Sequence, residues 1–538
     1  TDGKQIRRPF HWPLEFPEVF AGPRNGFDAM VGNPPFLGGQ KITGAMGTVF
    51  REYLVEQLAG GTRGSADLVS YFFLTAFSLL AKDGLFGLLA VNTIAEGNTR
   101  EIGLDRILAQ GGVIVAAYPS EVWPGTANVV TSRVHLVNGE WNGARTLAGK
   151  PVSRISSYLG TSESWAPVKL KTNLGLVFQG SITLGEGFLV DKDFAKAAIA
   201  EDPEYQKLIY PYLIGREVNQ SPEHLPGRLV INFFDWSEEK AAKFPLAYDK
   251  VVRDVKPERQ VRKDNGEYKL RKPLPQRWWQ YAEKRPALYH AIGRGDLYSS
   301  HPAGWKPGSV KFERVIVFAT GATKYPCFTL VPNEYICANT VCVVASDSYA
   351  LFACLSSDLH VVWAWEHGSK MKQDLRYTHG DIFETFPFPG GVLSNDSTDL
   401  ASLGAEFFDA RREYMVANDK GMTKFYNDFH DPDCNETAIV ACRDLQKQID
   451  DAVLVAYEID DIDLDIGFHE VGYLPADKNT RYTMSEEARQ KTLARLALLN
   501  RKQHESEANP GSTGKRSGSR RASNDALDDL FAERGSSL

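Results

Sequence analysis

Apolar and polar residues follow two alternating periodicities over the first 140 residues of the chain. The stretch 27–32 ("FDAMVG") is a short apolar run typical of a strand, and 85–93 ("LFGLLAVNT") is typical of a buried strand. Between them a helix is expected, ending by Gly84, because apolar residues recur at spacings of three and four: Leu68, Val69, Phe72, Phe73, Ala76, Leu79 and Leu80. This alternation predicts an α/β domain with a parallel sheet.

Three further elements complete this first region. Residues 99–112 have helical periodicity, whereas 113–119 ("VIVAAYP") and 127–137 ("ANVVTSRVHLV") are typical of strands. Only about nine residues, "SEVWPGTAN", connect these two strands. A helical crossover needs about a dozen residues or more, so the last two strands are expected to pair antiparallel.

The periodicity changes twice more along the chain. From 146 to 390, short strand-like runs are separated by Pro, Gly and charged residues, which predicts a mixed α+β domain rich in loops. From 391 to 505, three stretches with apolar spacings of three and four predict a small helical unit. The Ser-, Gly- and charge-rich tail 506–538 is expected to be disordered. The first domain is accordingly bounded at 1–145.

Composition narrows the class of protein. Hydrophobic residues make up 43%, yet no apolar run reaches the roughly 18 residues that span a bilayer, so no membrane partner is expected. The six cysteines contain no C-x-x-C pair, which favours reduced, buried thiols, a cytoplasmic location and no metal site. The net charge of -7 argues against a uniformly basic nucleic-acid coat, so any such contact must be local.

One motif carries chemistry: "GNPPF", which ends the first strand and contains Asn33, Pro34, Pro35 and Phe36. The Asn33 side-chain oxygen and the Pro34 carbonyl are two acceptors able to hold both N–H groups of an exocyclic amine. The prolines fix φ and lack N–H groups, which leaves a stiff backbone with free carbonyls. Phe36 offers a ring face for a base taken out of the helical stack.

The motif and the order of elements after it resemble the adenine-N6 DNA methyltransferases of the type IIG restriction-modification and phage-defence kind. The resemblance implies a class I methyltransferase (Rossmann-like) half-domain, a target-recognition domain at 146–390 and a helical tail. It also implies S-adenosyl-L-methionine as methyl donor, double-stranded DNA as substrate, and Trp123 as the residue that sandwiches the flipped adenine against Phe36.

The chain departs from that family in one respect. Only 32 residues precede Asn33, and they contain no strand followed by the glycine loop that holds the cofactor. The Gly-x-Gly of "SITLGEGF" (181–188) lies after the hairpin and is expected to be a tight turn. The cofactor-binding residues are therefore expected in a segment or subunit upstream of Thr1.

A basic and aromatic segment is the candidate DNA contact. Residues 253–294 hold twelve Lys or Arg against five Asp or Glu, and such residues neutralise phosphates. We assign the contacts to Arg259, Arg262, Lys263, Arg271, Lys272, Trp278 and Trp279. The alternative is a solvated loop whose two tryptophans anchor in the core. Lys41 and Arg63, in glycine-rich loops near the motif, are further phosphate-contact candidates.

Other interpretations stay open at this point. Asp67 is interpreted as a charge at a helix N-terminus in preference to a site residue. The motif also occurs in RNA and protein N-methyltransferases, which commonly end soon after the hairpin. A third possibility is a DNA-specificity fragment that is inactive without its cofactor-binding half.

Overall fold

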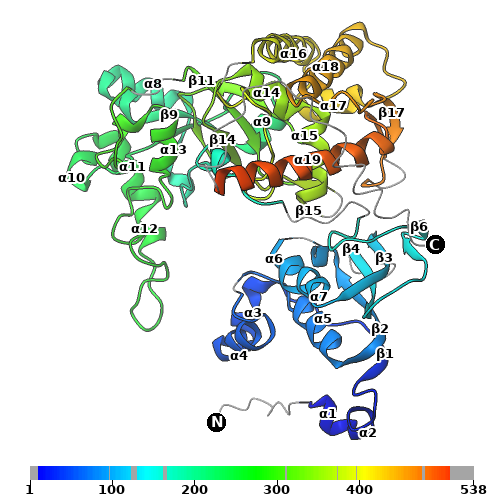
Figure 1. Cartoon of the computed structure of the whole chain (residues 1–538). Coiled ribbons are helices and arrows are strands. Elements are labelled where there is room, and N and C mark those ends of the chain that lie inside the picture. Colours follow the sequence, from blue (N-terminus) through cyan, green and yellow to red (C-terminus); the bar gives the residue numbers. More distant parts are fainter. Residues whose placement is uncertain are drawn as a thin grey trace.

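The computed structural model describes residues 10–62, 64–95, 97–122, 130–160, 167–308, 312–371, 374–394, 397–474 and 479–508 (Figure 1). In Figure 1 the first sheet and its helices form one unit, and the remaining sheets and helices form a second, larger one. Trp123, Arg63 and the expected disordered tail beyond Ala508 lie outside the described residues.

A six-stranded sheet organises the first unit, in the order β1-β2-β4-β3-β5-β6. Its strands are β1 (Phe27–Gly32), β2 (Leu80–Val91), β3 (Gly112–Val122), β4 (Val130–Asn138), β5 (Arg145–Leu147) and β6 (Lys150–Val152). The expected antiparallel hairpin is confirmed, because β4 pairs antiparallel with β3. β4 lies between β2 and β3 and is antiparallel to both. The sheet is therefore mixed, as a parallel sheet closed by an antiparallel hairpin requires, with parallel pairs at β1–β2 and β3–β5.

Helix α5 (Leu68–Leu79) forms where predicted but ends earlier, and it buries most of the predicted face with the exception of Phe72. β2 begins at Leu80, so the residues before Gly84 belong to the strand. Phe72, placed on the buried face by its spacing, is 42% exposed, whereas Phe73 is fully buried. Adjacent residues point about 100° apart around a helix axis, and the face that packs is centred on Phe73 and Phe77.

The other helices of this unit are short. α1 (Trp12–Glu15) and α2 (Pro17–Phe20) precede β1, and the chain after the motif forms α3 (Gly39–Met46), α4 (Thr48–Tyr53) and the π-helical turn η1 (Leu54–Leu58). The predicted helix at 99–112 is a continuous run of α6 (Gly97–Arg100), the π-helical turn η3 (Glu101–Asp105) and α7 (Arg106–Ala109).

The second unit is mixed α+β, as expected. Its two four-stranded sheets have the orders β13-β9-β10-β8 and β12-β11-β14-β7. The strands are β7 (Val177–Gln179), β8 (Leu189–Val190), β9 (Ile209–Leu213), β10 (Leu229–Ile231), β11 (Arg314–Ala319), β12 (Thr329–Pro332), β13 (Ile336–Cys337) and β14 (Val341–Val344). Gly185, in the "SITLGEGF" stretch, has a φ of 138° and precedes a short 3-10 helix, as a tight turn requires.

Helices of the middle region surround these sheets (Figure 1). They are α8 (Lys192–Glu201), α9 (Gly215–Gln220), α10 (Glu238–Ala241), α11 (Pro245–Asp254), α12 (Lys256–Arg259), α13 (Pro286–Ala291), α14 (Tyr349–Ser356) and α15 (Asp358–His367). A two-stranded ribbon of β15 (Ser369–Met371) and β16 (Asp374–Arg376) follows α15.

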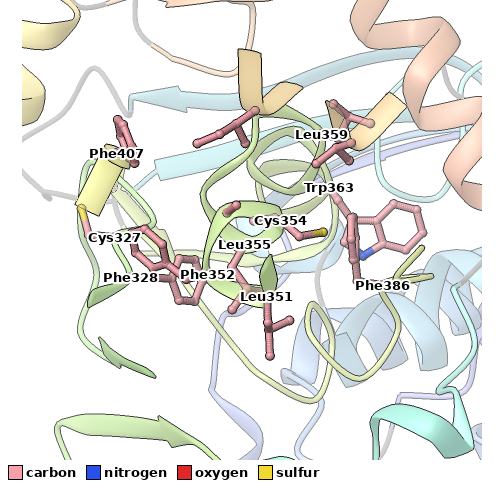
Figure 2. Close-up of a cluster of buried hydrophobic side chains, with 14 of the residues drawn as sticks. Cys327, Phe328, Leu351, Phe352, Cys354, Leu355, Leu359, Trp363, Phe386 and Phe407 are labelled. Carbon is pink, nitrogen blue, oxygen red and sulfur yellow. The ribbon is translucent and has the colours of Figure 1, made fainter. Parts of the chain in front are cut away.

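Long helices dominate the C-terminal region, as the spacings predict. They are α16 (Thr398–Ala417), α17 (Met422–Phe429), α18 (Thr437–Ala456) and α19 (Glu486–Ala508), with a hairpin of β17 (Gly467–Glu470) and β18 (Thr480–Thr483) before α19. Their apolar faces join α14, α15 and the β11 sheet in one core that contains Phe328, Phe352, Trp363, Phe386 and Phe407 (Figure 2). The domain boundaries at 145, 390 and 505 stay predictions.

Helix α19 also reaches back to the segment that follows the first unit. The Asn500 side chain accepts a hydrogen bond from the Val168 N–H at 3.0 Å and donates to the Val168 and Thr385 carbonyls. The Glu507 carboxylate accepts from the N–H groups of Lys171 and Thr172. The C-terminal helix thereby fixes the start of the second unit.

Burial of the cysteines agrees with their expected state. Five of the six are buried and all six are free. Burial raises the pKa of Cys327 to about 12, so this thiol stays protonated. In the described ranges, no helix combines the length and the apolar character that a membrane crossing requires.

Candidate active site and nucleic-acid interface

The motif loop begins where β1 ends. Gly32, the last residue of β1, pairs with Leu88 of the parallel strand β2, and Asn33 follows directly. Because β2 and β3 are both antiparallel to β4, they run in the same direction as each other and as β1. The carboxyl ends of β1, β2 and β3 therefore share one edge of the sheet, which is where open α/β sheets bind ligands.

The loop is exposed at its start and anchored at its end. Asn33 and Pro35 are exposed, while Pro34 and Phe36 are half-buried. Phe36 packs against the core of the first unit together with Leu37. The Asn33 side chain is thus free to accept hydrogen bonds from a bound group, and Phe36 presents a ring that the core holds in place.

Asp67 connects this loop to the start of α5 through hydrogen bonds. Its carboxylate accepts a hydrogen bond from the Val69 N–H at 3.0 Å, which caps α5, and another from the Leu37 N–H at 3.1 Å. The Leu68 N–H donates in turn to the Leu37 carbonyl at 2.9 Å. The expected N-terminal role of Asp67 is confirmed. Its hydrogen bond to Leu37 adds a positioning role that no local pattern signals, because the partners lie 30 residues apart.

Gly39 permits the close approach between the loop and α5. A Cβ at this position would lie 2.3 Å from the Ser65 carbonyl carbon and 2.5 Å from the Ala66 oxygen, both backbone atoms. Only a residue without a side chain fits there. The glycine that follows the motif is therefore required by packing.

The far side of the proposed base site is only partly described. Trp123 lies outside the described residues, and β3, the strand that leads to it, ends at Val122. Near that end, the Glu121 carboxylate accepts two hydrogen bonds from Arg133 at 2.6 and 2.7 Å. The hydrogen bond with Glu121 raises the pKa of Arg133, and the guanidinium covers the Tyr118 ring at 4.1 Å.

Lys41 was expected in a glycine-rich loop, but the chain there is helical. Lys41 belongs to α3, which begins at Gly39. Gly38 and Gly39 do not prevent helix formation, because the Lys41 N–H donates a hydrogen bond to the Gly38 carbonyl, as in a helical turn. Lys41 is exposed and stays a candidate contact, as does Arg63.

Three residues of the basic segment are buried and were wrongly assigned to DNA. Arg259 is 1% exposed, and its guanidinium donates to the carbonyls of Leu184, Thr183 and Gln280. Trp278 and Trp279 are 2% and 8% exposed, and the Trp279 indole N–H donates to the Trp236 carbonyl at 2.9 Å. The alternative interpretation, that the tryptophans anchor this segment in the core, is the correct one.

The other basic candidates are exposed. Arg262, Lys263, Arg271 and Lys272 lie on the chain that follows α12, which Figure 1 shows projecting away from the second unit. Arg271 is paired with Glu283 at 3.3 Å but keeps 81% of its side chain exposed. These four residues are available to a partner in solution.

The described residues before Asn33 do not contain the elements expected to hold a cofactor. Between Phe10 and β1 the structure has only α1 and α2, so no described strand and glycine loop precede Asn33. The residues present therefore do not fit S-adenosylmethionine by themselves. Within the described ranges, no three His, Cys, Asp or Glu side chains gather as a metal site.

Comparisons with known proteins agree with this arrangement. Residues 2–110 match the Eco57I restriction-modification methylase family, and residues 311–390 match the MmeI target recognition domain. The chain thus combines a restriction-modification methylase segment with a target recognition segment. The resemblance recognised from the motif is confirmed.

One solved structure has a similar fold over most of this chain. The type IIL restriction-modification enzyme MmeI, solved in complex with DNA, matches with a TM-score of 0.61 and 16% identity over 88% of this chain and 57% of that chain. The chain thus spans little more than half the length of that enzyme. The type IIG restriction endonuclease BpuSI matches with 10% identity and a TM-score of 0.27, over 80% of this chain and 54% of that chain, too low to support an argument. The search of curated proteins found no match.

Proposed function

We propose that the chain is part of a site-specific DNA methyltransferase that transfers a methyl group from S-adenosylmethionine to adenine N6 in a restriction-modification or phage-defence system. The observation that carries the proposal is the placement of Asn33-Pro34-Pro35-Phe36. The loop leaves a strand at the carboxyl edge of the sheet, with its amide exposed and its ring fixed by the core. The matches to a restriction-modification methylase and a target recognition domain support DNA as the substrate.

In the proposed mechanism, the motif loop binds the flipped adenine. The Asn33 side-chain oxygen and the Pro34 carbonyl accept the two N–H groups of N6, which draws the nitrogen lone pair out of conjugation with the ring. Phe36 stacks on one face of the flipped base, and Trp123 is proposed for the other. S-adenosylmethionine supplies the methyl group. The surplus proton leaves N6 for solvent, because an alkylated amine of this type is strongly acidic, and no protein base is needed.

The sheet topology supports a class I methyltransferase half-domain. In that arrangement an antiparallel last strand is inserted between two parallel ones, as β4 is inserted between β2 and β3. β1 is at the end of the strand order and has one neighbour, β2, among the described strands. We propose that strands and the glycine loop from an upstream segment or subunit continue the sheet from β1 and bind the cofactor.

A test of the function separates chemistry from binding. Asn33→Ala in the complete enzyme removes one of two acceptors for N6 and touches no buried contact. We expect methylation to fall at least about a hundredfold, by analogy with the loss of one transition-state hydrogen bond, while DNA affinity changes less than about twofold. Gln40→Ala, at an exposed amide in the second position of α3, is the matched control and should leave both unchanged. Full methylation by Asn33→Ala would refute the assignment.

Two other functions are separated by simple comparisons. Methylation of RNA or of a protein amide in preference to duplex DNA would favour the RNA and protein N-methyltransferases. If the isolated chain binds DNA but shows no S-adenosylmethionine binding in equilibrium dialysis, it is a specificity fragment when alone, and adding the upstream polypeptide should restore transfer.

A further inference from the structure

The most exposed structured segment of the second unit is the chain from Val261 to Lys272, here called the finger. It leaves α12 and projects beyond the neighbouring helices in Figure 1. Its first nine residues fold back as a short hairpin ribbon with one isolated antiparallel β-bridge, between Arg262 and Tyr268, and the Lys269 N–H donates to the Val261 carbonyl at 2.8 Å. Ten of its twelve residues are exposed, and only Tyr268 and Leu270 are half-buried.

The finger is held in a defined shape although it buries almost nothing. The Arg262 guanidinium lies 4.2 Å from the Tyr268 ring centre and donates to the Tyr268 hydroxyl and the Gly266 carbonyl. A turn closes the tip, where the Gly266 N–H donates to the Lys263 carbonyl at 2.9 Å.

The root of the finger is rigid. Arg259 is the residue that ends α12, and its three hydrogen bonds to backbone carbonyls fix the point at which the finger leaves the unit. On the return side, the Gln260 side chain donates to the Pro275 carbonyl at 3.1 Å. A ribbon stiffened at both root and tip delivers its side chains to a fixed position outside the fold.

The charge of the finger indicates the chemistry of its partner. It carries five basic residues, Arg262, Lys263, Lys269, Arg271 and Lys272, against two acidic ones, Asp264 and Glu267. The protein as a whole has a net charge of -7, so the positive charge is concentrated where the chain protrudes. A polyanion is the partner that fits such a distribution.

We propose that the finger enters the major groove of the substrate DNA and adds to sequence recognition. The major groove admits a two-stranded β-ribbon. Lys263 and Asp264 at the tip reach base edges, while Lys269, Arg271 and Lys272 contact phosphates on either side. The proposal rests on DNA being the substrate. It adds a recognition element outside residues 311–390, the segment that matches the MmeI target recognition domain.

The ribbon can be removed without disturbing its root. Because the Lys269 N–H and the Val261 carbonyl are already hydrogen-bonded, replacing residues 262–268 by Asn-Gly closes the chain with a two-residue turn that keeps this bond. The shortened enzyme should keep its melting temperature. We expect it to lose at least about tenfold in discrimination between its recognition sequence and a scrambled duplex, the size of one or two lost base contacts.

Salt dependence separates base contacts from phosphate contacts. The triple variant Lys269→Ala, Arg271→Ala, Lys272→Ala should weaken binding to both duplexes alike and reduce the slope of log K against log salt by about 3, close to 0.9 for each lost phosphate contact. Lys192→Ala with Lys196→Ala, two exposed lysines of α8, is the charge control and should change neither quantity.

The outcomes are distinguishable from failure of the proposed function. If the parent enzyme binds its DNA specifically and the shortened finger keeps affinity and discrimination, the finger inference is wrong and the methyltransferase proposal stands. If the parent enzyme has no affinity for DNA, both are wrong. Should the shortened enzyme unfold, Lys263→Ala alone tests the tip, and unchanged discrimination there overturns base recognition by Lys263.

Discussion

Substitution of Arg259 tests whether the buried cation of the basic segment has a structural role, in contrast to the exposed cations that we assign to DNA. We consider Arg259→Met, which keeps the length of the side chain and removes the guanidinium. Three carbonyls, those of Leu184, Thr183 and Gln280, then lose the donor that Arg259, itself 1% exposed, supplies, and the bond to Gln280 is buried. Burial lowers the pKa of Arg259 to about 10, so the residue still carries its charge at neutral pH.

The expected loss follows from these three bonds. Each hydrogen bond to a charged group contributes about 1.5–3 kcal/mol to the free energy of unfolding. The Met variant offsets part of this loss, because it no longer buries a charge. Removing one side of such a network typically costs about 3–5 kcal/mol. Each kcal/mol is worth about 2–4 °C in a domain of roughly 150–250 residues, and the second unit is larger, so we expect a fall of at most roughly 10 °C in melting temperature.

The assay compares Arg259→Met with Arg262→Met. Thermal unfolding followed by tryptophan fluorescence is suitable, because Trp236, Trp278 and Trp279 lie in the same core. Arg262→Met, at an exposed position, should melt within about 1 °C of the parent, as surface substitutions usually do. A stable Arg259→Met that loses salt-dependent DNA affinity would refute the reasoning and return Arg259 to the phosphate contacts.

Two further predictions concern packing and pH. Gly39→Ala should lower both melting temperature and methylation, because its Cβ meets backbone atoms at 2.3–2.5 Å, whereas Gly44→Ala in the same helix meets nothing within 4 Å and should be neutral or slightly stabilising. Burial raises the pKa of Asp358 to about 6, and burial beside Asp358 raises the pKa of Asp450 well above its usual value. Both carboxyls are protonated in the folded state where the unfolded chain is ionised, so their stabilisation is complete below about pH 4 and is lost as pH rises through 6 and beyond. Asp450→Asn should therefore raise the melting temperature at pH 8 more than at pH 5, and an equal shift at both would contradict this.

The motif and the order of elements could be predicted from sequence because they depend on residues that are close together along the chain. "FDAMVG" has the length and apolar content of a strand, and it forms β1, although none of its residues is buried. The Asn-Pro-Pro that follows must leave the strand at its carboxyl end. The short connection before β4 fixed its antiparallel direction. The position of β4 between β2 and β3 is a tertiary choice that neither strand encodes alone.

The misassigned residues share one cause. Arg259, Trp278 and Trp279 look like DNA contacts because Arg and Trp between lysines are common in both interfaces and anchored loops. Their burial depends on carbonyls contributed by Leu184 and Trp236, which are far away along the chain. The hydrogen bonds of Asp67 to Leu37 and of Asn500 to Val168 were missed for the same reason.

The most direct test of the central claim is nucleoside analysis after transfer of a tritiated methyl group from S-adenosylmethionine to unmethylated DNA by the complete enzyme containing this chain. The account predicts N6-methyladenine as the only labelled nucleoside, and its loss in Asn33→Ala. Label on cytosine, label only in RNA or protein, or unchanged N6-methyladenine in Asn33→Ala would contradict it.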